Sequence, residues 1–240
     1  MVEYLKNIKA AILAGGLGSR LRSVVNDRPK VMAEIGGRPF LAYLLHKLEE
    51  AGIGQVVLCT GHMGEIISDT FGNAHGRLGL HYSRETVPLG TGGAVRYALP
   101  LLDSESVLVM NGDSYCDADL NAFWEFHQSE GAQATLLLVK SADSGRFGHV
   151  RINSKGQVVR FDEKSAVAAA GWINAGMYLL KRELILSIPP GKRVSLEEEI
   201  FPAWIGLGLY GFQSNGSFID IGIPEDYAKA EQIMSPYNID

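Results

Sequence analysis

Short apolar runs alternate with amphipathic segments through the first half of the chain, and this alternation limits the folds open to the sequence. The apolar runs predict strands at 9–13, 55–59 and 107–110, and the amphipathic segments predict helices at 40–51, 65–71 and 91–101. Strands this apolar do not suit a sheet with one face in water. The pattern therefore predicts an α/β fold of βαβ units around a mostly parallel sheet.

The helix expected at 40–51 illustrates the pattern. Pro39 suits the first helical turn, and leucines recur at helical spacing from Leu41 to Leu48. Gly52 suits the left-handed position that often ends a helix.

From about residue 134 the sequence changes to short strand-like segments joined by turns of Gly, Asn and Ser. These segments lie at 134–140, 148–152, 157–161 and 176–180, and they predict antiparallel hairpins laid against the first half. Helices are expected from Ser195, where Ser195-Leu-Glu-Glu198 fits a capping box, and after Pro224. No repeat or linker divides the sequence, so we expect a single domain over 1–240 with two parts, 1–133 and 134–240.

The balance of charges excludes several kinds of partner. The 240-residue chain has 22 basic and 27 acidic residues and a net charge of −5, and neither sign forms a run. We therefore expect no nucleic acid and no membrane as a partner. An anionic ligand would need a local cluster of positive charge.

The two cysteines and the absence of targeting patterns predict a cytoplasmic protein. Cys59 and Cys116 lie far apart in apolar segments, which indicates reduced, structural thiols rather than a disulfide framework. No N-terminal stretch has the pattern of a signal peptide, and no apolar run is long enough to span a membrane.

A glycine-rich turn follows the first predicted strand. Gly15, Gly16 and Gly18 lack a Cβ, so backbone N–H groups there can approach a phosphate closely. The spacing matches neither the Walker pattern G-x-x-x-x-G-K-[ST] nor the dinucleotide pattern G-x-G-x-x-G. Taken alone, the turn therefore fits either a phosphate site or an ordinary tight turn.

Two cations near this turn favour the phosphate interpretation. Arg20 and Lys30 would balance the charge that builds on a triphosphate as a P–O bond breaks. Arg22 and Arg28 lie nearby, and we interpret them as solvated surface charges.

Two aspartates have the character of metal ligands. Asp113 follows a buried strand in Leu108-Val-Met-Asn-Gly-Asp-Ser114, and Asp220 lies in Phe218-Ile-Asp-Ile-Gly222. Ligands bind at such strand ends in open α/β sheets, and Mg²⁺ often takes only one or two carboxylates from a protein. The alternative is that each aspartate caps a turn or a helix.

The loop Glu85-Thr-Val-Pro-Leu-Gly-Thr-Gly-Gly93 leads into a predicted helix whose N-terminus should offer free N–H groups to a ligand. An ionised Glu85 accepts hydrogen bonds only, so it would pair with the adjacent N1–H and N2–H₂ donors of guanine. Uracil and thymine offer one donor on that edge. The alternative for Glu85 is an exposed charge at a strand end.

Other chemistries lack the spacing they need. The six histidines show no metal-ligand pattern, and no serine lies in a G-x-S-x-G turn, so zinc hydrolysis and acyl transfer are not expected.

Seven segments together resemble the sugar-1-phosphate nucleotidylyltransferases. They are Leu13-Ala-Gly-Gly-Leu-Gly-Ser-Arg-Leu21, Pro29-Lys30, Pro88-Leu-Gly-Thr-Gly-Gly93, Asn111-Gly-Asp113, Asp162-Glu-Lys164, Asn174-Ala-Gly-Met-Tyr178 and Phe218-Ile-Asp-Ile-Gly-Ile-Pro224. The resemblance spans nearly the whole chain. Within that family, Leu21-Arg-Ser-Val-Val25, Gly37-Arg-Pro-Phe40 and Ser195-Leu-Glu-Glu198 are most similar to the D-glycero-α-D-manno-heptose 1-phosphate guanylyltransferases.

The resemblance implies a Rossmann-like nucleotidyltransferase fold with a mixed, mostly parallel sheet and a smaller antiparallel sugar-binding part. It assigns catalysis to Arg20, Lys30 and Asp113. It places the nucleotide on Leu13, Ala14, Gly15, Gly16, Gly18, Ser19, Glu85, Pro88, Gly90 and Thr91. It places the sugar phosphate on Gly112, Glu163, Lys164 and Asn174, and Mg²⁺ on Asp113 and Asp220.

The activity that the resemblance implies is transfer of GMP from GTP to a sugar 1-phosphate, with the heptose above as the expected sugar. Two alternatives remain open: a guanylyl- or uridylyltransferase acting on a hexose or amino-sugar 1-phosphate, and a non-catalytic sensor of nucleotide sugars. A homodimer is possible for this family. Larger members carry a C-terminal hexapeptide-repeat domain, and this sequence has no such repeats, so we expect no appended acyltransferase.

Overall fold

The computed structural model describes residues 4–16, 18, 20–21, 23–141, 148–162 and 171–237. A ten-stranded sheet runs through this part of the chain, and its centre is parallel. Strand β1 (Lys9–Ala14) pairs in parallel with β4 (Gln55–Thr60) on one side and with β7 (Ser106–Asn111) on the other. Beyond β4 lies β6 (Leu78–Arg84), also parallel, and then the short antiparallel β5 (Ala74–His75). The predicted α/β fold with a mostly parallel sheet is confirmed.

The strands of the second half continue the same sheet. The long strand β12 (Gly171–Lys181) pairs antiparallel with β7, and β9 (Ala134–Ser141) pairs antiparallel with β12. The hairpin of β10 (His149–Ile152) and β11 (Val158–Asp162) and the strand β13 (Leu209–Ser214) complete this half. The predicted antiparallel pairing is therefore present, but these strands extend the first sheet edge to edge because β12 hydrogen-bonds directly to β7.

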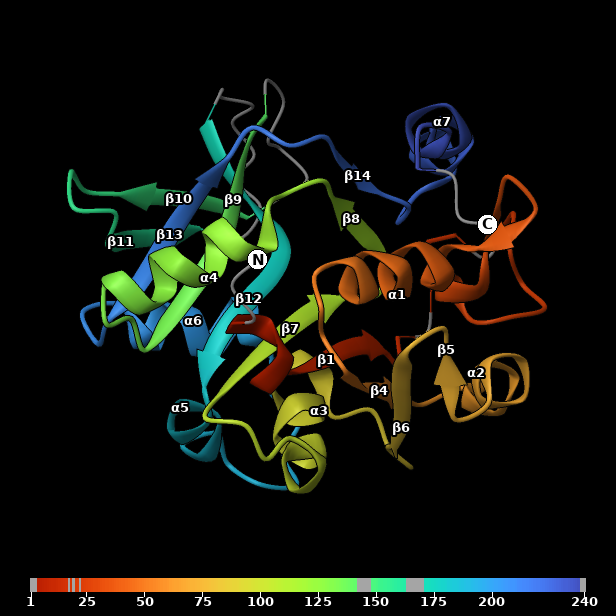
Figure 1. Cartoon of the computed structure of the whole chain (residues 1–240), viewed down its shortest axis with the longest axis horizontal. Coiled ribbons are helices and arrows are strands. Elements are labelled where there is room, and N and C mark those ends of the chain that lie inside the picture. The colour runs from red at the N-terminus through yellow and green to blue at the C-terminus, as the bar shows by residue number, and fades with distance from the viewer. Residues whose placement is uncertain are drawn as a thin grey trace.

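Helices cover both faces of the sheet, as the uniformly apolar strands require (Figure 1). The helices are α1 (Phe40–Glu50), α2 (Gly64–Phe71), α3 (Gly90–Ala98), α4 (Leu120–Ser129), α5 (Arg182–Leu186), α6 (Phe201–Trp204) and α7 (Pro224–Met234). Ile12 of β1 packs in one buried cluster with Leu44 of α1, whereas the adjacent Ala11 packs in the other with Val95 of α3. Successive side chains of a strand point to opposite faces, so both must be apolar.

Short elements complete the chain. They are the 3₁₀ turns η1 (Tyr4–Asn7), η2 (Lys30–Met32) and η3 (Leu99–Leu101), the π-helical turn η4 (Leu196–Ile200), and the paired strands β2 (Glu34–Ile35) with β3 (Arg38–Pro39) and β8 (Ser114–Cys116) with β14 (Phe218–Asp220). Helix α1 begins at Phe40 and Gly52 beyond its end has a positive φ of 83°, both as predicted, but Pro39 is the extended residue before the first turn and not part of that turn.

The helix predicted to start at Ser195 begins there, but its capping pattern differs from the prediction. Ser195 Oγ accepts the Glu198 N–H as expected, at 3.1 Å. The side chain that returns to the Ser195 N–H is Glu199, at 2.9 Å, and not Glu198. The reason is the wider turn of η4, in which the Ile200 N–H reaches back five residues to the Ser195 carbonyl.

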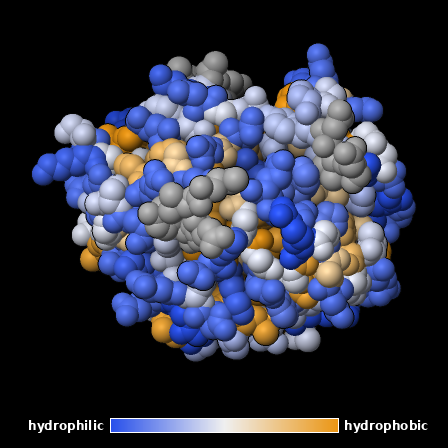
Figure 2. All heavy atoms as spheres, in the orientation of Figure 1, coloured by the Kyte–Doolittle hydropathy of each residue, from blue (hydrophilic) through white to orange (hydrophobic). Residues whose placement is uncertain are grey.

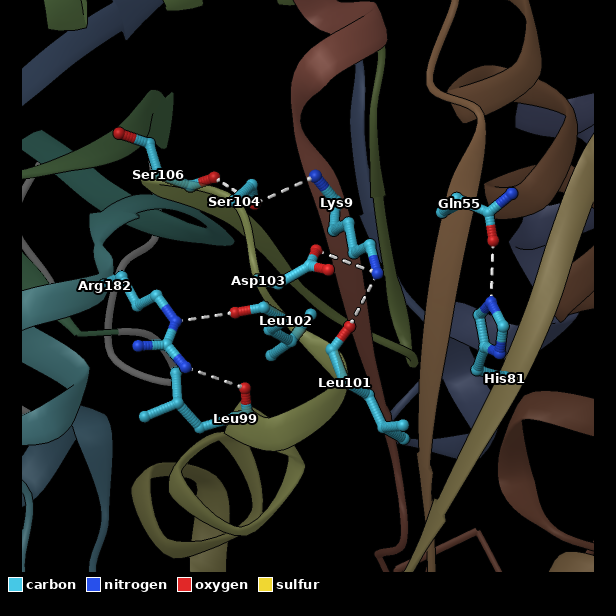
Figure 3. Close-up of polar contacts among 10 residues, drawn as sticks. All are labelled: Lys9, Gln55, His81, Leu99, Leu101, Leu102, Asp103, Ser104, Ser106 and Arg182. Atoms are coloured by element: carbon cyan, nitrogen blue, oxygen red, sulfur yellow. Dashed lines mark hydrogen bonds and ion pairs between the residues drawn. The ribbon is translucent and has the colours of Figure 1, made fainter.

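Polar contacts close the amino-terminal end of the sheet (Figure 3). Lys9 Nζ donates to the Leu101 carbonyl at 3.1 Å and lies 2.9 Å from Asp103 Oδ1. Arg182 donates from Nε to the Leu102 carbonyl at 3.0 Å. Lys9 and Arg182 therefore have protein partners, and the opposite end, where the parallel strands finish, is where a ligand is expected.

Both cysteines are free and buried, as predicted. Within the described ranges, no helix is long and apolar enough to cross a membrane. On the face drawn in Figure 2, hydrophilic residues cover most of the coloured surface and hydrophobic residues lie in small separate groups. The homodimer stays a prediction.

Candidate active site

A cavity of about 410 Å³ lies at the carboxyl ends of the parallel strands, and we call it the glycine-loop cavity. Twelve of the sequence-predicted residues line it: Leu13, Ala14, Gly15, Gly16, Gly18, Arg20, Lys30, Glu85, Pro88, Gly90, Thr91 and Asp113. The predicted Ser19 lies outside the described residues. Residues from four separate segments thus meet around one space.

A second cavity of about 220 Å³ adjoins the first, and we call it the bulge cavity because β12 bulges beside it. Arg20, Thr91, Asn111 and Asp113 line both cavities. Asn174 and Asp220 line the bulge cavity and not the glycine-loop cavity, and their roles in binding the sugar phosphate and the metal stay predictions. The predicted Glu163 and Lys164 lie outside the described residues.

Gly112 is placed differently from its neighbours in the predicted set. It is not among the described residues that line either cavity, although Asn111 and Asp113 are. Its N–H donates to the Leu13 carbonyl at 3.0 Å, and a Cβ at this position would lie 2.6 Å from that oxygen. Glycine at position 112 therefore allows the ends of β1 and β7 to pack closely. A role for Gly112 in binding the sugar phosphate stays a prediction.

The glycine-rich turn needs its glycines to hold this arrangement. Gly18 has a positive φ of 59°, and a Cβ there would lie 3.2 Å from the Lys30 Cβ. A Cβ on Gly15 would lie 3.1 Å from Glu85 Oε1. The turn consequently packs against both Lys30 and Glu85, which brings a cation and an acceptor to one cavity.

Lys30, Asp113 and Asp220 form the charged centre of the site. Lys30 Nζ lies 2.6 Å from Asp113 Oδ2, and the lysine side chain is only 10% exposed. The pairing of β14 with β8 places Asp220 across from Ser114, and the Ile221 N–H donates to the Asp113 carbonyl at 2.9 Å. Burial raises the pKa of Asp220, and the charge of Asp113 raises it further, while Lys30 opposes this rise.

These two carboxylates fit a divalent cation. The raised pKa of Asp220 reports burial beside a second negative charge, which a cation would balance. Among the described residues, no three or more His, Cys, Asp and Glu side chains gather to hold a metal. Mg²⁺ suits such a sparse site, because it takes one or two carboxylates and completes its shell with phosphate and water oxygens.

Glu85 lies at the wall of the glycine-loop cavity and is half-buried. Its Oε2 accepts the Leu89 N–H at 3.2 Å, and its own N–H donates to the Thr60 carbonyl at 2.9 Å. Burial raises the pKa of this carboxyl group, and the bond from Leu89 opposes the rise. Oε1 faces Gly15 and Gly61, so Glu85 is an oriented acceptor and not an exposed charge at a strand end.

The prediction of free N–H groups at the start of α3 is wrong for two of them. The Gly92 and Gly93 N–H groups donate to the Val194 carbonyl, at 2.9 and 3.2 Å. A Cβ on Gly90 would lie 2.6 Å from the same oxygen. These glycines therefore allow the segment at Val194 to pack against the start of α3. The Val194 carbonyl accepts the two N–H groups that were expected to be free for a ligand.

Sequence reasoning assigned no role to several residues that line the cavities. Asn111 lines both, and its buried Oδ1 has no hydrogen-bond partner among the described residues. It stands next to Gly112 in the Asn111-Gly-Asp113 motif, which is a signal that could have found it. Glu197 lines the bulge cavity, and the sequence indicates for it only a place in a capping segment. Arg193 lines the glycine-loop cavity without belonging to any motif.

The nucleotidyl transferase family model matches residues 9–235 of this chain. The D-glycero-alpha-D-manno-heptose 1-phosphate guanylyltransferase of Aneurinibacillus thermoaerophilus is 39% identical over 96% of this chain and 100% of its own length. The enzyme with the same description from Campylobacter jejuni is 34% identical over 92% and 97%. The mannose-1-phosphate guanylyltransferase of Mycobacterium tuberculosis is 37% identical over 92% of this chain, which spans 63% of that relative.

Solved structures agree with this picture. HddC from Yersinia pseudotuberculosis matches with a TM-score of 0.85 at 35% identity over 95% of this chain and 99% of its own. The same protein complexed with GMP-PN matches with a TM-score of 0.83. A putative glucose-1-phosphate thymidylyltransferase from Bacillus anthracis has a TM-score of 0.88 at 20% identity, which shows the fold alone. The fold is the Rossmann-like fold of these nucleotidyltransferases.

Proposed function

This chain belongs to the nucleotidyl transferase family and is a sugar-1-phosphate nucleotidyltransferase, and from that premise we propose that it transfers GMP from GTP to D-glycero-α-D-manno-heptose 1-phosphate, giving GDP-heptose and pyrophosphate. The observation that carries the proposal is the pair of adjoining cavities, with Arg20 and Asp113 at their shared wall. One cavity suits each substrate. The heptose is favoured because this chain matches two heptose 1-phosphate guanylyltransferases over almost the whole length of each.

The proposed reaction is an in-line attack by an oxygen of the sugar phosphate on the α-phosphorus, with pyrophosphate leaving. The second pKa of a phosphate is about 6, so the nucleophile is already an anion at neutral pH. No general base is needed. The task of the protein is to hold two polyanions in line and to balance the charge that builds between them.

The residues divide this task between them. Arg20 lines both cavities, and it would contact the phosphates of both substrates. Lys30 adds a second positive charge, and its ion pair with Asp113 holds that charge in place. Asp113 and Asp220 would hold Mg²⁺. When bound, the ion acts as a Lewis acid that stabilises negative charge on phosphate oxygens. Asn174 lines the bulge cavity and would contact the sugar. Roles for Ser19, Glu163 and Lys164 in binding the substrates are also part of the proposal.

A panel assay tests the function. Pyrophosphate release is measured with GTP, UTP, ATP and dTTP against heptose, mannose, glucose and N-acetylglucosamine 1-phosphates in the presence of Mg²⁺. The proposal expects the highest kcat/KM with GTP and the heptose phosphate. A preference for a hexose phosphate or for UTP would replace the proposed substrates, and no release with any pair would favour a nucleotide-sugar sensor.

Glu85→Gln should erode the preference for GTP. The amide places an N–H₂ where guanine needs an acceptor, so we expect the ratio of kcat/KM for GTP over UTP to fall roughly 10- to 100-fold. Glu65→Gln is the matched control, because Glu65 is exposed and pairs with Arg84 outside the cavity. An unchanged ratio in Glu85→Gln would assign base recognition to another residue.

Asp220→Asn should make the metal-free protein more stable at pH 7. The folded-state pKa of Asp220 is raised, chiefly by burial, so its stabilising contribution is complete below the ordinary value and is lost as the pH rises through the folded value. Asparagine copies the neutral form. In EDTA we therefore expect the Tm of the variant to exceed that of the wild type at pH 7 and to approach it near pH 4.

Mg²⁺ supplies the second half of this test. Added at pH 7, it should raise the Tm of the wild type and leave the Tm of Asp220→Asn nearly unchanged, because only the wild type gains a ligand for its paired carboxylates. A wild type that is the more stable protein in EDTA and indifferent to Mg²⁺ would contradict the metal assignment.

We propose the cytoplasm as the location. Two buried free thiols and the use of a nucleoside triphosphate support a reducing compartment. A homodimer is proposed from the family alone.

A further inference from the structure

Glu197 is the acceptor of three hydroxyl groups at the wall of the bulge cavity. Its Oε1 accepts the Tyr178 O–H at 3.0 Å. Its Oε2 accepts Thr91 Oγ1 at 2.6 Å and Ser195 Oγ at 3.2 Å. These bonds join η4 to the start of α3 and to β12, so one carboxylate connects elements from both sides of the site.

The hydrogen bond from Tyr178 to Glu197 determines how the Asn174 amide in the cavity wall is oriented. Because the Tyr178 hydroxyl donates to Glu197, its oxygen is left to accept, and Asn174 Nδ2 donates to it at 2.8 Å. Asn174 Oδ1 then accepts the Gly176 N–H at 3.0 Å. Both ends of the Asn174 amide are thereby assigned, and only one orientation satisfies all partners.

Burial keeps this chain of hydrogen bonds in one state. The Tyr178 side chain is fully buried against Phe201, with 4.8 Å between the ring centroids. Burial raises the pKa of Tyr178 well above its usual range, and the charge of Glu197 raises it further, so the phenol stays a donor.

The backbone of β12 brings Asn174 to the cavity. The strand register shifts between Asn174 and Tyr178, and Gly176 in this bulge has a positive φ of 72°. A Cβ on Gly176 would lie 2.7 Å from Ser114 Oγ, so glycine is required there. The bulge holds the Asn174 amide beside Arg20 and Asp113 in the lining of the bulge cavity.

We propose that Glu197 is a positioning residue for the sugar 1-phosphate: acting through Tyr178, it sets which end of the Asn174 amide meets the sugar. This inference rests on the proposed function, in which the bulge cavity holds the sugar phosphate. With Glu197 in place, Asn174 keeps one Nδ2–H and one Oδ1 lone pair for sugar hydroxyls. If the amide turned over, its N–H₂ would face the Gly176 N–H, donor against donor.

Glu197→Gln should perturb the hydrogen bond to Tyr178 more than the hydrogen bonds to Thr91 and Ser195. Two hydroxyl groups donate to Oε2 and one donates to Oε1. A glutamine leaves fewer conflicts when its oxygen faces Thr91 and Ser195 and its N–H₂ faces Tyr178. The Tyr178 hydroxyl then loses its acceptor, and the amide side chains of Asn174 and Asn111, which both hydrogen-bond Tyr178, are the groups left beside it. Contacts on the nucleotide side are largely kept.

The test compares Glu197→Gln, Tyr178→Phe, the double variant and Glu198→Gln. Glu198 is the matched control because it is the next residue of η4 and is exposed. The assay uses the nucleotide and sugar 1-phosphate that the wild type turns over fastest. We expect the KM for the sugar phosphate to rise roughly tenfold in each single variant, with the KM for the nucleotide within about twofold of wild type.

The double variant separates positioning from general damage. Because the two residues act in series, its KM for the sugar phosphate should not exceed that of the more affected single variant. An unchanged KM for the sugar phosphate in both single variants overturns the proposal, and so does an equal rise in both KM values with additive effects in the double variant. A wild type that releases no pyrophosphate with any pair overturns the proposed function itself, which is a different result from an active wild type with unaffected variants.

Discussion

Arg20→Ala should lower kcat by roughly 10²- to 10³-fold, the loss typical of removing one donor that stabilises charge in a transition state. Among the described residues Arg20 is the one cation that lines both cavities, so the proposed reaction would build negative charge beside it. Arg20→Lys should recover only part of the rate, because an ammonium lacks the planar fork that binds two phosphate oxygens together. Single-turnover kinetics with saturating substrates measure the effect on the chemical step.

Arg28→Ala is the matched control from the same segment. Arg28 Nε donates to Asp27 at 3.0 Å and Nη1 donates to Glu34, and Arg28 is not among the described residues that line either cavity. Its loss should change kcat less than about twofold, since exposed ion pairs contribute little. Near-normal turnover in Arg20→Ala, or an equal loss in both variants, would remove Arg20 from the reaction.

Lys30→Met should destabilise the fold by about 1.5–3 kcal/mol at pH 7 and also abolish most of the activity. The substitution keeps an unbranched side chain that is one atom shorter, and it leaves Asp113 without the partner that lies 2.6 Å away. Asp220, buried beside Asp113, loses the charge that opposes its raised pKa. The charge of Asp113 then acts on Asp220 with only Arg20 and the Gly222 N–H left to oppose it. Lys181→Met, which breaks a remote pair with Glu105, is the control.

The loss in Lys30→Met should depend on pH with a definite sign. The repulsion is greatest when both carboxylates are ionised, and protonation of Asp220 relieves it. The folded-state pKa of Asp220 lies above its ordinary value. The loss of unfolding free energy in Lys30→Met should therefore be largest at pH 7 and shrink as the pH falls through the folded-state pKa of Asp220. Urea unfolding at pH 7 and pH 4.5 measures the difference, and a deficit that grows in acid would contradict this electrostatic account.

The parallel centre of the sheet was predictable because its strands are continuous apolar runs between amphipathic helices. The position of the second half was not, since the pairing of β12 with β7 joins segments far apart in sequence and leaves no local pattern. Arg20 and Lys30 could be predicted from the glycine-rich turn that they accompany, and Asp113 from the end of its strand. Asp220 reaches them through β14 and β8, which are three residues each and too short to show a period.

The role of Glu197 had no signature in the sequence. Its partners Tyr178 and Thr91 lie 19 and 106 residues away, and only the folded chain brings them together. The capping pattern at Ser195 was predicted for an α-helix and is realised in a π-turn, which moves the return bond from Glu198 to Glu199. The glycines at 90–93 predict a ligand site at the start of a helix. In the structure the Gly92 and Gly93 N–H groups donate to the Val194 carbonyl instead.

Phosphorus-31 NMR of the wild-type reaction tests the central claim most directly. With GTP, D-glycero-α-D-manno-heptose 1-phosphate and Mg²⁺, we predict loss of the three GTP resonances and of the sugar monophosphate. One pyrophosphate signal and the two coupled resonances of GDP-heptose should appear in equal molar amounts. GDP or orthophosphate in place of pyrophosphate, or a spectrum that does not change, would contradict guanylyl transfer to a sugar 1-phosphate.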